Sequence, residues 1–202
     1  MPRKVDHDER RRHIVEALLR IAGNRGLDAV SLREVAQEAG VSMGAVQHYF
    51  STKEEMLGFA LGHWLTLSVH EHFTARVRRR LGEGDPRPRP RSREVLLALA
   101  AEYLPHDAAS RFDARVALAF LSRAAYDPAL ARALTPAFES FTATLRAVLA
   151  TARPNGDPAV EARRLAALLD GLRMPVLVGA LPYKEALAVV EDHLDRLLPP
   201  PA

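Results

Sequence analysis

The sequence predicts an all-α protein of about nine helices, and three observations support this fold class. Apolar residues recur about every 3.6 positions through long segments, which is the period of a helix with one buried face. No short run alternates apolar and polar residues as a strand does. Glycine, proline and polar clusters separate the periodic segments. The 202 residues, 48% hydrophobic and 26% charged, are therefore expected to form one compact helical domain or two small ones.

The composition also excludes several kinds of chemistry. Cysteine is absent, which rules out disulfides, thiolate nucleophiles, cysteine-ligated zinc and thiol redox sensing. The sequence has no arrangement of nucleophile and base and no glycine-rich phosphate loop, so neither an enzyme nor a cofactor is expected. The first twelve residues mix both charges, and no apolar run is long enough to span a membrane. We therefore expect a cytoplasmic protein.

The first helix is expected over residues 8–25. Ile14, Ala17, Leu18 and Ile21 fall on one face of this helix, and Gly26 is suited to end it in a left-handed conformation. These positions predict one continuous buried stripe along the first helix.

Two short helices are expected next, over residues 32–39 and from residue 43 to about 50. Ser31 stands three positions before Glu34, which is the spacing of a capping box at a helix start. Gly40 interrupts the pattern, and Ser42 is suited to cap the following helix.

A much longer fourth helix is expected through Trp64 toward Arg80, because Ser51 and Glu54 repeat the capping-box spacing. The prolines in residues 82–90 predict an exposed loop. The remaining helices are expected at residues 92–104, 108–126, 128–152, 158–179 and 182–198, with disturbances at Pro136 and Pro175.

The most specific pattern lies between residues 32 and 49. Two helices that cross steeply through a short turn need a small residue at the crossing, a glycine in the turn and an apolar plug on the second helix. Ala36, Gly40 and Val46 provide these in order, which is the helix-turn-helix pattern. An ordinary helical hairpin could show the same three residues.

The rest of the second helix favours DNA binding. If Val46 is buried, then Met43, Gly44, Gln47 and His48 face outward. Small residues let a helix enter a major groove about 12 Å wide, and glutamine suits the N6/N7 edge of adenine.

A further indication is Lys53, which would lie in the first turn of the fourth helix. A cation at this position opposes the helix dipole, at a cost of a few tenths of a kcal/mol to about 1 kcal/mol. A DNA phosphate would explain the lysine. The alternative is a solvated lysine screened by Glu54 and Glu55. Arg3 and Lys4 fit either a minor-groove arm or a disordered tail.

Residues 14–57 resemble the DNA-binding part of the TetR family of bacterial transcriptional repressors. The segment reads IVEALLRIAGNRGLDAVSLREVAQEAGVSMGAVQHYFSTKEEML. The remainder is similar to that family in its helical layout, and DGLRMPVLVG with the final amphipathic helix looks like its dimerisation helices. The resemblance implies a helix-turn-helix DNA-binding domain over residues 1–52 and a helical effector-binding and dimerisation domain over residues 53–202.

The resemblance implies a ligand-responsive transcriptional regulator, specifically a homodimeric repressor that a small-molecule effector releases from a palindromic operator. Positions that match the family's DNA contacts are Ser31, Arg33, Ser42, Met43, Gly44, Ala45, Gln47, His48, Tyr49 and Lys53. Ser31, Arg33, Tyr49 and Lys53 match phosphate contacts. Gln47 departs from the family, which very often has an aromatic residue there, so a backbone contact is exchanged for base reading.

The resemblance also implies an effector cavity among the later helices. Aromatic candidates for its lining are Trp64, Tyr103, Phe120, Phe138 and Phe141, for which core packing is the alternative. His63, His70 and His72 lie close together in sequence, but no carboxylate pattern accompanies them, so no metal site is expected.

Wide apolar stripes on the last two helices exceed what one neighbouring helix covers, which predicts a homodimer through a four-helix interface. The expected interface residues are Leu165, Leu168, Leu169, Leu172, Val176, Leu187, Val190, Leu194 and Leu197. Burial inside one subunit is the alternative. For the whole chain, the alternative function is a helical small-molecule-binding protein whose helix-turn-helix is only structural.

Overall fold

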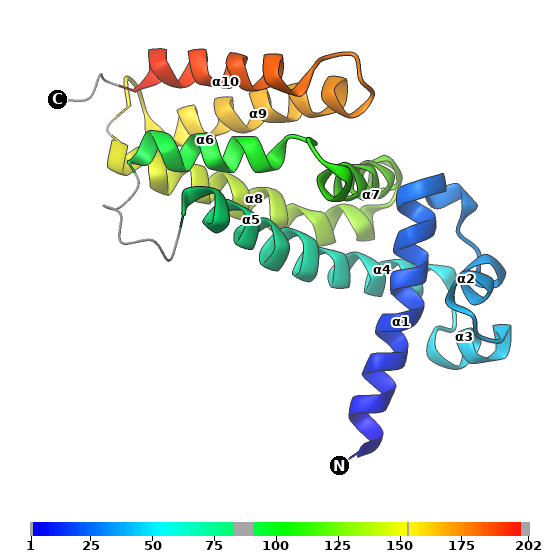
Figure 1. The fold of residues 1–202 in the computed structure, drawn as a ribbon. Helices are drawn as coiled ribbons and strands as arrows, with labels where there is room; N and C mark the ends of the chain where they lie inside the picture. The colour runs from blue at the N-terminus through cyan, green and yellow to red at the C-terminus, as the bar shows by residue number, and fades with distance from the viewer. Residues whose placement is uncertain (1, 83–90, 153, 199–202) are drawn as a thin grey trace. The chain divides into compact units, whose positions relative to one another are not determined.

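The computed structural model confirms the all-α fold class (Figure 1). It describes residues 2–82, 91–152 and 154–198, and every regular element in these ranges is a helix. The α-helices are α1 (Pro2–Arg25), α2 (Leu32–Ala39), α3 (Met43–Tyr49), α4 (Lys53–Trp64), α5 (Phe73–Leu81), α6 (Ser92–Tyr103), α7 (Ala108–Ala124), α8 (Pro128–Ala152), α9 (Pro158–Leu177) and α10 (Tyr183–Leu197). A 3-10 turn, η1 (Leu27–Ala29), follows α1, and a π-helical segment, η2 (Leu65–His72), links α4 to α5.

All nine expected helices are found in the described ranges, because α4, η2 and α5 together form the expected long fourth helix. The π-helical geometry of its middle was not expected from sequence. Pro136 and Pro175 lie inside α8 and α9, which continue through them. The expected loop lies outside the described residues except for Gly82, which ends α5 with a φ of 72°.

The chain divides into two compact units. The first unit comprises residues 1–70 with 112–135, and the second comprises residues 71–111 with 136–202. The functional division between residues 52 and 53 remains a prediction, since compactness alone does not assign function.

Two expected helix starts are wrong. Helix α1 begins at Pro2 instead of residue 8, because proline fits the first helical turn and nothing in the next six residues breaks a helix. The cap of α4 is Thr52 instead of Ser51. The Thr52 Oγ1 accepts the Glu55 backbone N–H at 3.0 Å, and the Glu55 carboxylate accepts the Ser51 N–H at 2.8 Å. The N-cap is therefore shifted by one residue from the expected Ser51, and the Glu55 carboxylate accepts the N–H of Ser51 rather than that of the cap residue.

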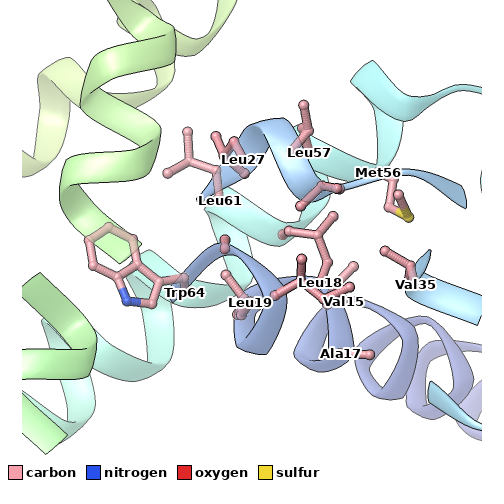
Figure 2. Packing of buried hydrophobic residues seen from close by; sticks show 14 of the residues in the cluster. Val15, Ala17, Leu18, Leu19, Leu27, Val35, Met56, Leu57, Leu61 and Trp64 are labelled. Atoms are coloured by element: carbon pink, nitrogen blue, oxygen red, sulfur yellow. The ribbon is translucent and has the colours of Figure 1, made fainter. Parts of the chain in front are cut away.

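The core of the first unit is built on the apolar stripe of α1. Val15, Ala17 and Leu18 are fully buried there, and Figure 2 shows Val15 and Leu18 facing Leu57 and Leu61 of α4. The expected stripe of Ile14, Ala17, Leu18 and Ile21 is thus confirmed as buried. This packing fixes α1 against the start of α4, where the candidate DNA contacts lie.

Polar contacts add to this attachment of α1. The Arg11 guanidinium lies over the rings of Phe50 and Phe59, 4.8 and 4.3 Å from their centroids, and reaches the Glu55 carboxylate at 3.4 Å. The His13 Nε2 is 2.9 Å from the carbonyl oxygen of Ala39, at the end of α2. These contacts hold α1 to α2 and to the start of α4.

The second unit has its own core, formed by α5, α6, α8, α9 and α10. Leu96, Leu145 and Leu165 are fully buried in it. Glu102 is also buried, and its carboxylate lies 2.7 Å from the Arg80 Nε and 3.3 Å from the Arg76 Nε. A buried carboxylate needs such partners, so the arginines allow α6 to bury a charge against α5.

Most of the expected dimer-interface assignment is wrong. Six of its nine residues are buried inside a single chain, namely Leu165, Leu169, Val176, Val190, Leu194 and Leu197. A partner subunit cannot reach side chains that are already covered. Helix α6 packs against both α9 and α10, which supplies a neighbour that periodicity alone could not assign. Leu168, Leu172 and Leu187 are half-buried.

No helix in the described ranges combines the length and the apolar character needed to cross a membrane.

Candidate nucleic-acid interface

Helices α2 and α3 are defined by matched end signals. The Ser31 Oγ accepts the Glu34 N–H at 3.1 Å and caps α2, and the Ser42 Oγ accepts the Ala45 N–H at 3.1 Å and caps α3. Between them Gly40 has a φ of 67°, a left-handed conformation that glycine adopts without steric cost. All three end signals expected from sequence are confirmed.

The orientation of α3 is set by Val46. Its side chain is 0% exposed, and it shares a buried cluster with Ala36 of α2 and with Val35. Burial of a valine stabilises the fold by about 1.5 kcal/mol or more, so rotating α3 about its axis would lose this energy. The expected burial of Val46 is confirmed.

The opposite side of α3 is open to solvent. Ser42, Met43, Gly44, Gln47 and His48 are exposed, with Met43 at 45%, as expected. Ala45 and Tyr49 are half-buried at the edges of this surface.

Gly44 gives this surface a functional character. A Cβ built at Gly44 would meet nothing closer than the Ser42 Oγ at 3.9 Å, so the fold itself tolerates alanine there. Glycine inside a helix costs about 1 kcal/mol relative to alanine. The absence of a side chain at Gly44 is compatible with close approach of a DNA groove.

An aromatic cluster borders the open face of α3. The ring of His7, on α1, lies edge-on to Tyr49 at 4.8 Å, and His48 lies edge-on to Tyr49 at 5.0 Å. His7 was not expected at this surface, because the sequence pattern placed the start of α1 at residue 8. The extension of α1 thus brings a further hydrogen-bonding side chain to the edge of the α3 surface.

The expected phosphate contacts lie around this surface. Ser31 and Arg33 are exposed at the start of α2, and Lys53 is the half-buried first residue of α4. Among the ion pairs of the described residues none includes Lys53, and the neighbouring Glu55 pairs with Arg11. The Lys53 side chain is thus compatible with the expected phosphate contact. The side chains of Arg3 and Lys4 lie outside what the structure describes.

The aromatic residues proposed for an effector cavity fall into two pairs and one separate residue. Trp64 stacks on Phe120 in the first unit, and Tyr103 stacks on Phe141 in the second, with centroid distances of 6.3 and 4.7 Å. Phe138 is exposed on a surface groove between α8 and α9 and therefore does not line an enclosed cavity.

The three histidines near η2 lie in different surroundings. His63 is half-buried 3.8 Å from Glu16 on α1, and burial lowers the pKa of its imidazole. His70 and His72 are exposed. No cluster of three or more potential metal ligands occurs among the residues that the structure describes.

A small helical unit that buries Val46 and exposes a groove-sized face of α3 defines a helix-turn-helix DNA-binding protein. The chain belongs to the TetR family of transcriptional regulators. Residues 14–58 match the model described as "Bacterial regulatory proteins, tetR family", and residues 90–199 match the "BetI-type transcriptional repressor, C-terminal" model. It is thus a transcriptional regulator, not an enzyme.

Named relatives agree over nearly the whole chain. The HTH-type transcriptional regulator PksA of Bacillus subtilis is 31% identical over 98% of this chain and 90% of its own length. The HTH-type transcriptional regulator BetI of Burkholderia cenocepacia is 33% identical over 98% of both chains. These relatives contradict the alternative of a helix-turn-helix with only a structural role.

Solved structures share the fold. A transcriptional regulator from Rhodococcus sp. Rha1 is 32% identical, with a TM-score of 0.77 over 95% of this chain and 99% of its own. A putative transcriptional regulator from Saccharomonospora viridis, solved in complex with choline, is 23% identical with a TM-score of 0.82 over 96% of this chain and 100% of its own.

The two kinds of contact predict different mutant phenotypes. If Lys53 makes the expected phosphate contact, Lys53→Ala should lower operator affinity for all sequences alike and decrease the slope of log affinity against log salt by about 1. If Gln47 makes the expected base contact, Gln47→Ala should relax preference at one or two positions of each half-site, at a cost of about 1–3 kcal/mol. Binding to a set of operator variants over a salt series measures both effects. A uniform loss in both variants would contradict this division of roles.

Proposed function

We propose that this regulator is a homodimeric repressor that binds a two-fold operator and is released from it by a small molecule. The observation that carries the proposal is the exposed face of α3, held outward by buried Val46. A single α3 reads only a few base pairs, so a specific operator requires two copies. The reading helices would then lie about 34–36 Å apart, or a multiple of it. The proposal places the protein in the cytoplasm, where bacterial DNA lies.

A surface for dimerisation lies on the outward side of α9. Val160, Ala167, Gly171, Met174 and Val178 are all exposed there, with Met174 at 40% and Val178 at 67%. Val160, Ala167 and Met174 are seven positions apart. Gly171 and Val178 each follow one of them by four positions, and this spacing is that of a helix-packing seam. A Cβ at Gly171 would meet no atom of this chain within 4 Å, so the glycine leaves room for a second helix. We name these five residues the α9 stripe. The stripe replaces the buried residues first expected at the interface.

A charge in the α9 stripe should separate the subunits. Met174→Glu places two carboxylates near a two-fold axis, and the dimer dissociation constant should rise at least about tenfold, which is about 1.4 kcal/mol. Ala150→Glu, at an exposed position of α8, is the matched control and should remain dimeric. Sedimentation velocity across a concentration series measures this. A Met174→Glu protein as dimeric as the control would exclude the stripe as the interface.

The effector site is proposed at Trp64. This side chain is 5% exposed, and its indole Nε1 is buried without a hydrogen-bond partner. Stacking on Phe120, with an angle of 17° between the rings, fixes the direction of the N–H. A buried donor without an acceptor costs about 1–3 kcal/mol, which a ligand oxygen would recover.

The position of Trp64 also suits a role in release. Trp64 is the last residue of α4, whose first residue is Lys53, and the π-helical segment η2 begins directly after it. π-Helical turns occur frequently at functional sites. An effector that binds one geometry of this helix more tightly than another would change operator affinity. The size of the change is set by the difference between the two binding free energies of the effector.

The second aromatic pair is a weaker candidate for the effector site. Tyr103 is covered by Phe141 on one face and by the Arg173 guanidinium, 4.8 Å from its centroid. Its hydroxyl donates to Asp170, and burial raises the pKa of Tyr103 to about 12. The Tyr103 ring is thus already packed against two side chains of the same subunit.

Choline is the first effector to test, because a fold neighbour was solved in complex with it. Trp64 is the only tryptophan of the chain, so its fluorescence reports on this site alone. Choline should shift the emission and lower operator affinity. Trp64→Phe keeps an aromatic ring but lacks the N–H, and should weaken the choline response about 2- to 13-fold, as expected for one hydrogen bond.

Tetramethylammonium, which lacks an oxygen, is the control ligand. It should release the operator less well than choline, and equally from both proteins. An undiminished choline response in Trp64→Phe would exclude Trp64 from the site. No response of the wild-type protein would exclude choline as the effector.

A further inference from the structure

We infer that Arg115 of α7 is a positioning residue for DNA binding, which holds the C-terminal end of α1 and thereby sets the spacing of the two reading heads. With Arg111, one turn earlier, it makes α7 the connection between α1 and α9. The inference rests on the proposed dimeric repressor, since spacing has meaning only for two heads.

The contact of Arg115 is specific. Its Nε donates to the carbonyl oxygen of Gly23 at 2.6 Å, across 92 positions of the sequence. Helix α1 ends at Arg25, so this carbonyl lies in the last turn, where carbonyls have no partner within the helix. A cation at a helix C-terminus also complements the helix dipole. Arg115 therefore caps the helix on which the helix-turn-helix is packed.

Gly23 makes the approach of α7 possible. A Cβ at this buried position would lie 2.4 Å from Cε2 of the Phe112 ring, a distance that real structures do not show. The Phe112 ring therefore lies directly on the α1 backbone. Phe112 and Arg115 are three positions apart on α7, so both contacts come from neighbouring positions on the helix surface. Neither contact belongs to the DNA-reading surface itself.

Arg111 makes an equivalent contact at the end of another helix. Its Nη1 donates to the carbonyl oxygens of Leu177 at 3.3 Å and Val176 at 3.5 Å, in the last turn of α9. Helix α9 carries the α9 stripe proposed for dimerisation. Arg111 and Arg115 are one turn apart on a single helix, α7, which continues without a break from Ala108 to Ala124.

Two arginines of one helix thus cap the ends of α1 and α9. The backbone hydrogen bonds of a helix resist bending, so a helix that is held at one turn also holds its next turn in place. We therefore assign to these two caps the connection of the dimerisation helix with the helix that carries the reading head. Loss of either cap should leave the half-site sequence unchanged and loosen the distance between half-sites.

The test is selection of bound sites from random DNA by the full-length wild-type protein and by Arg115→Ala, with the half-site spacing read directly. Arg123→Ala is the matched control, because Arg123 lies on the same helix and pairs only weakly with Asp127 at 3.9 Å. The wild-type and Arg123→Ala proteins should select one spacing. Arg115→Ala should select the same half-sites over a broader range of spacings and bind the wild-type operator about tenfold more weakly.

Two further variants keep the test decisive if Arg115→Ala unfolds early in a thermal scan. Arg115→Lys keeps the charge and should restore most of the spacing preference, and Arg111→Ala should broaden the spacing as Arg115→Ala does. Selection of the wild-type spacing by both alanine variants would overturn the inference. Selection of half-sites without any fixed spacing by the wild-type protein would instead contradict the proposed dimeric operator binding.

Discussion

The burial of Val46 is the constraint on which the DNA-reading surface depends. Helix α3 has seven residues, too few to be stable alone, so its orientation comes from packing on the cluster that contains Ala36 and the α1 stripe. Once Val46 is covered, the helical period leaves Met43, Gly44, Gln47 and His48 no direction but outward. The caps at Ser31 and Ser42 and the left-handed Gly40 fix where each helix begins and ends. The contacts of Arg11 and His13 then hold this assembly to α1.

Three helical glycines differ in whether packing within the subunit requires the absence of a side chain. Gly23 is required by the protein's own packing, because the Phe112 ring occupies the space of a Cβ. Gly44 and Gly171 are not required by it, since a Cβ would meet no close neighbour at either position. Glycine in a helix costs about 1 kcal/mol relative to alanine, and the packing of this chain does not explain that cost at Gly44 or Gly171. For Gly44 we assign DNA to this role, and for Gly171 a second copy of the chain.

The fold and the α3 surface could be predicted because both depend on local patterns. Helical periodicity, the Ser31 and Ser42 caps and the turn at Gly40 act within a few residues. Thr52 is the cap of α4 because its hydroxyl accepts the backbone N–H of Glu55, and spacing alone does not reveal which of the two neighbouring hydroxyls does so. The dimer residues were misassigned because α6 lies far away in sequence yet covers α9 and α10. The contacts of His7, Phe112 and Arg115 likewise join distant segments, so no single-helix pattern could have identified them.

The most direct test of the central claim is affinity cleavage of the operator from α3 itself. The chain has no cysteine, so Met43→Cys provides one attachment point for an iron chelate that cuts nearby DNA. A cysteine at exposed Ala147 of α8 is the matched control. The account predicts two clusters of cuts in the Met43→Cys complex, one in each half-site, whose centres lie about 34–36 Å apart or a multiple of it, and none from position 147. Retained operator binding with no cuts from position 43 beyond the control would show that the exposed face of α3 does not read the DNA.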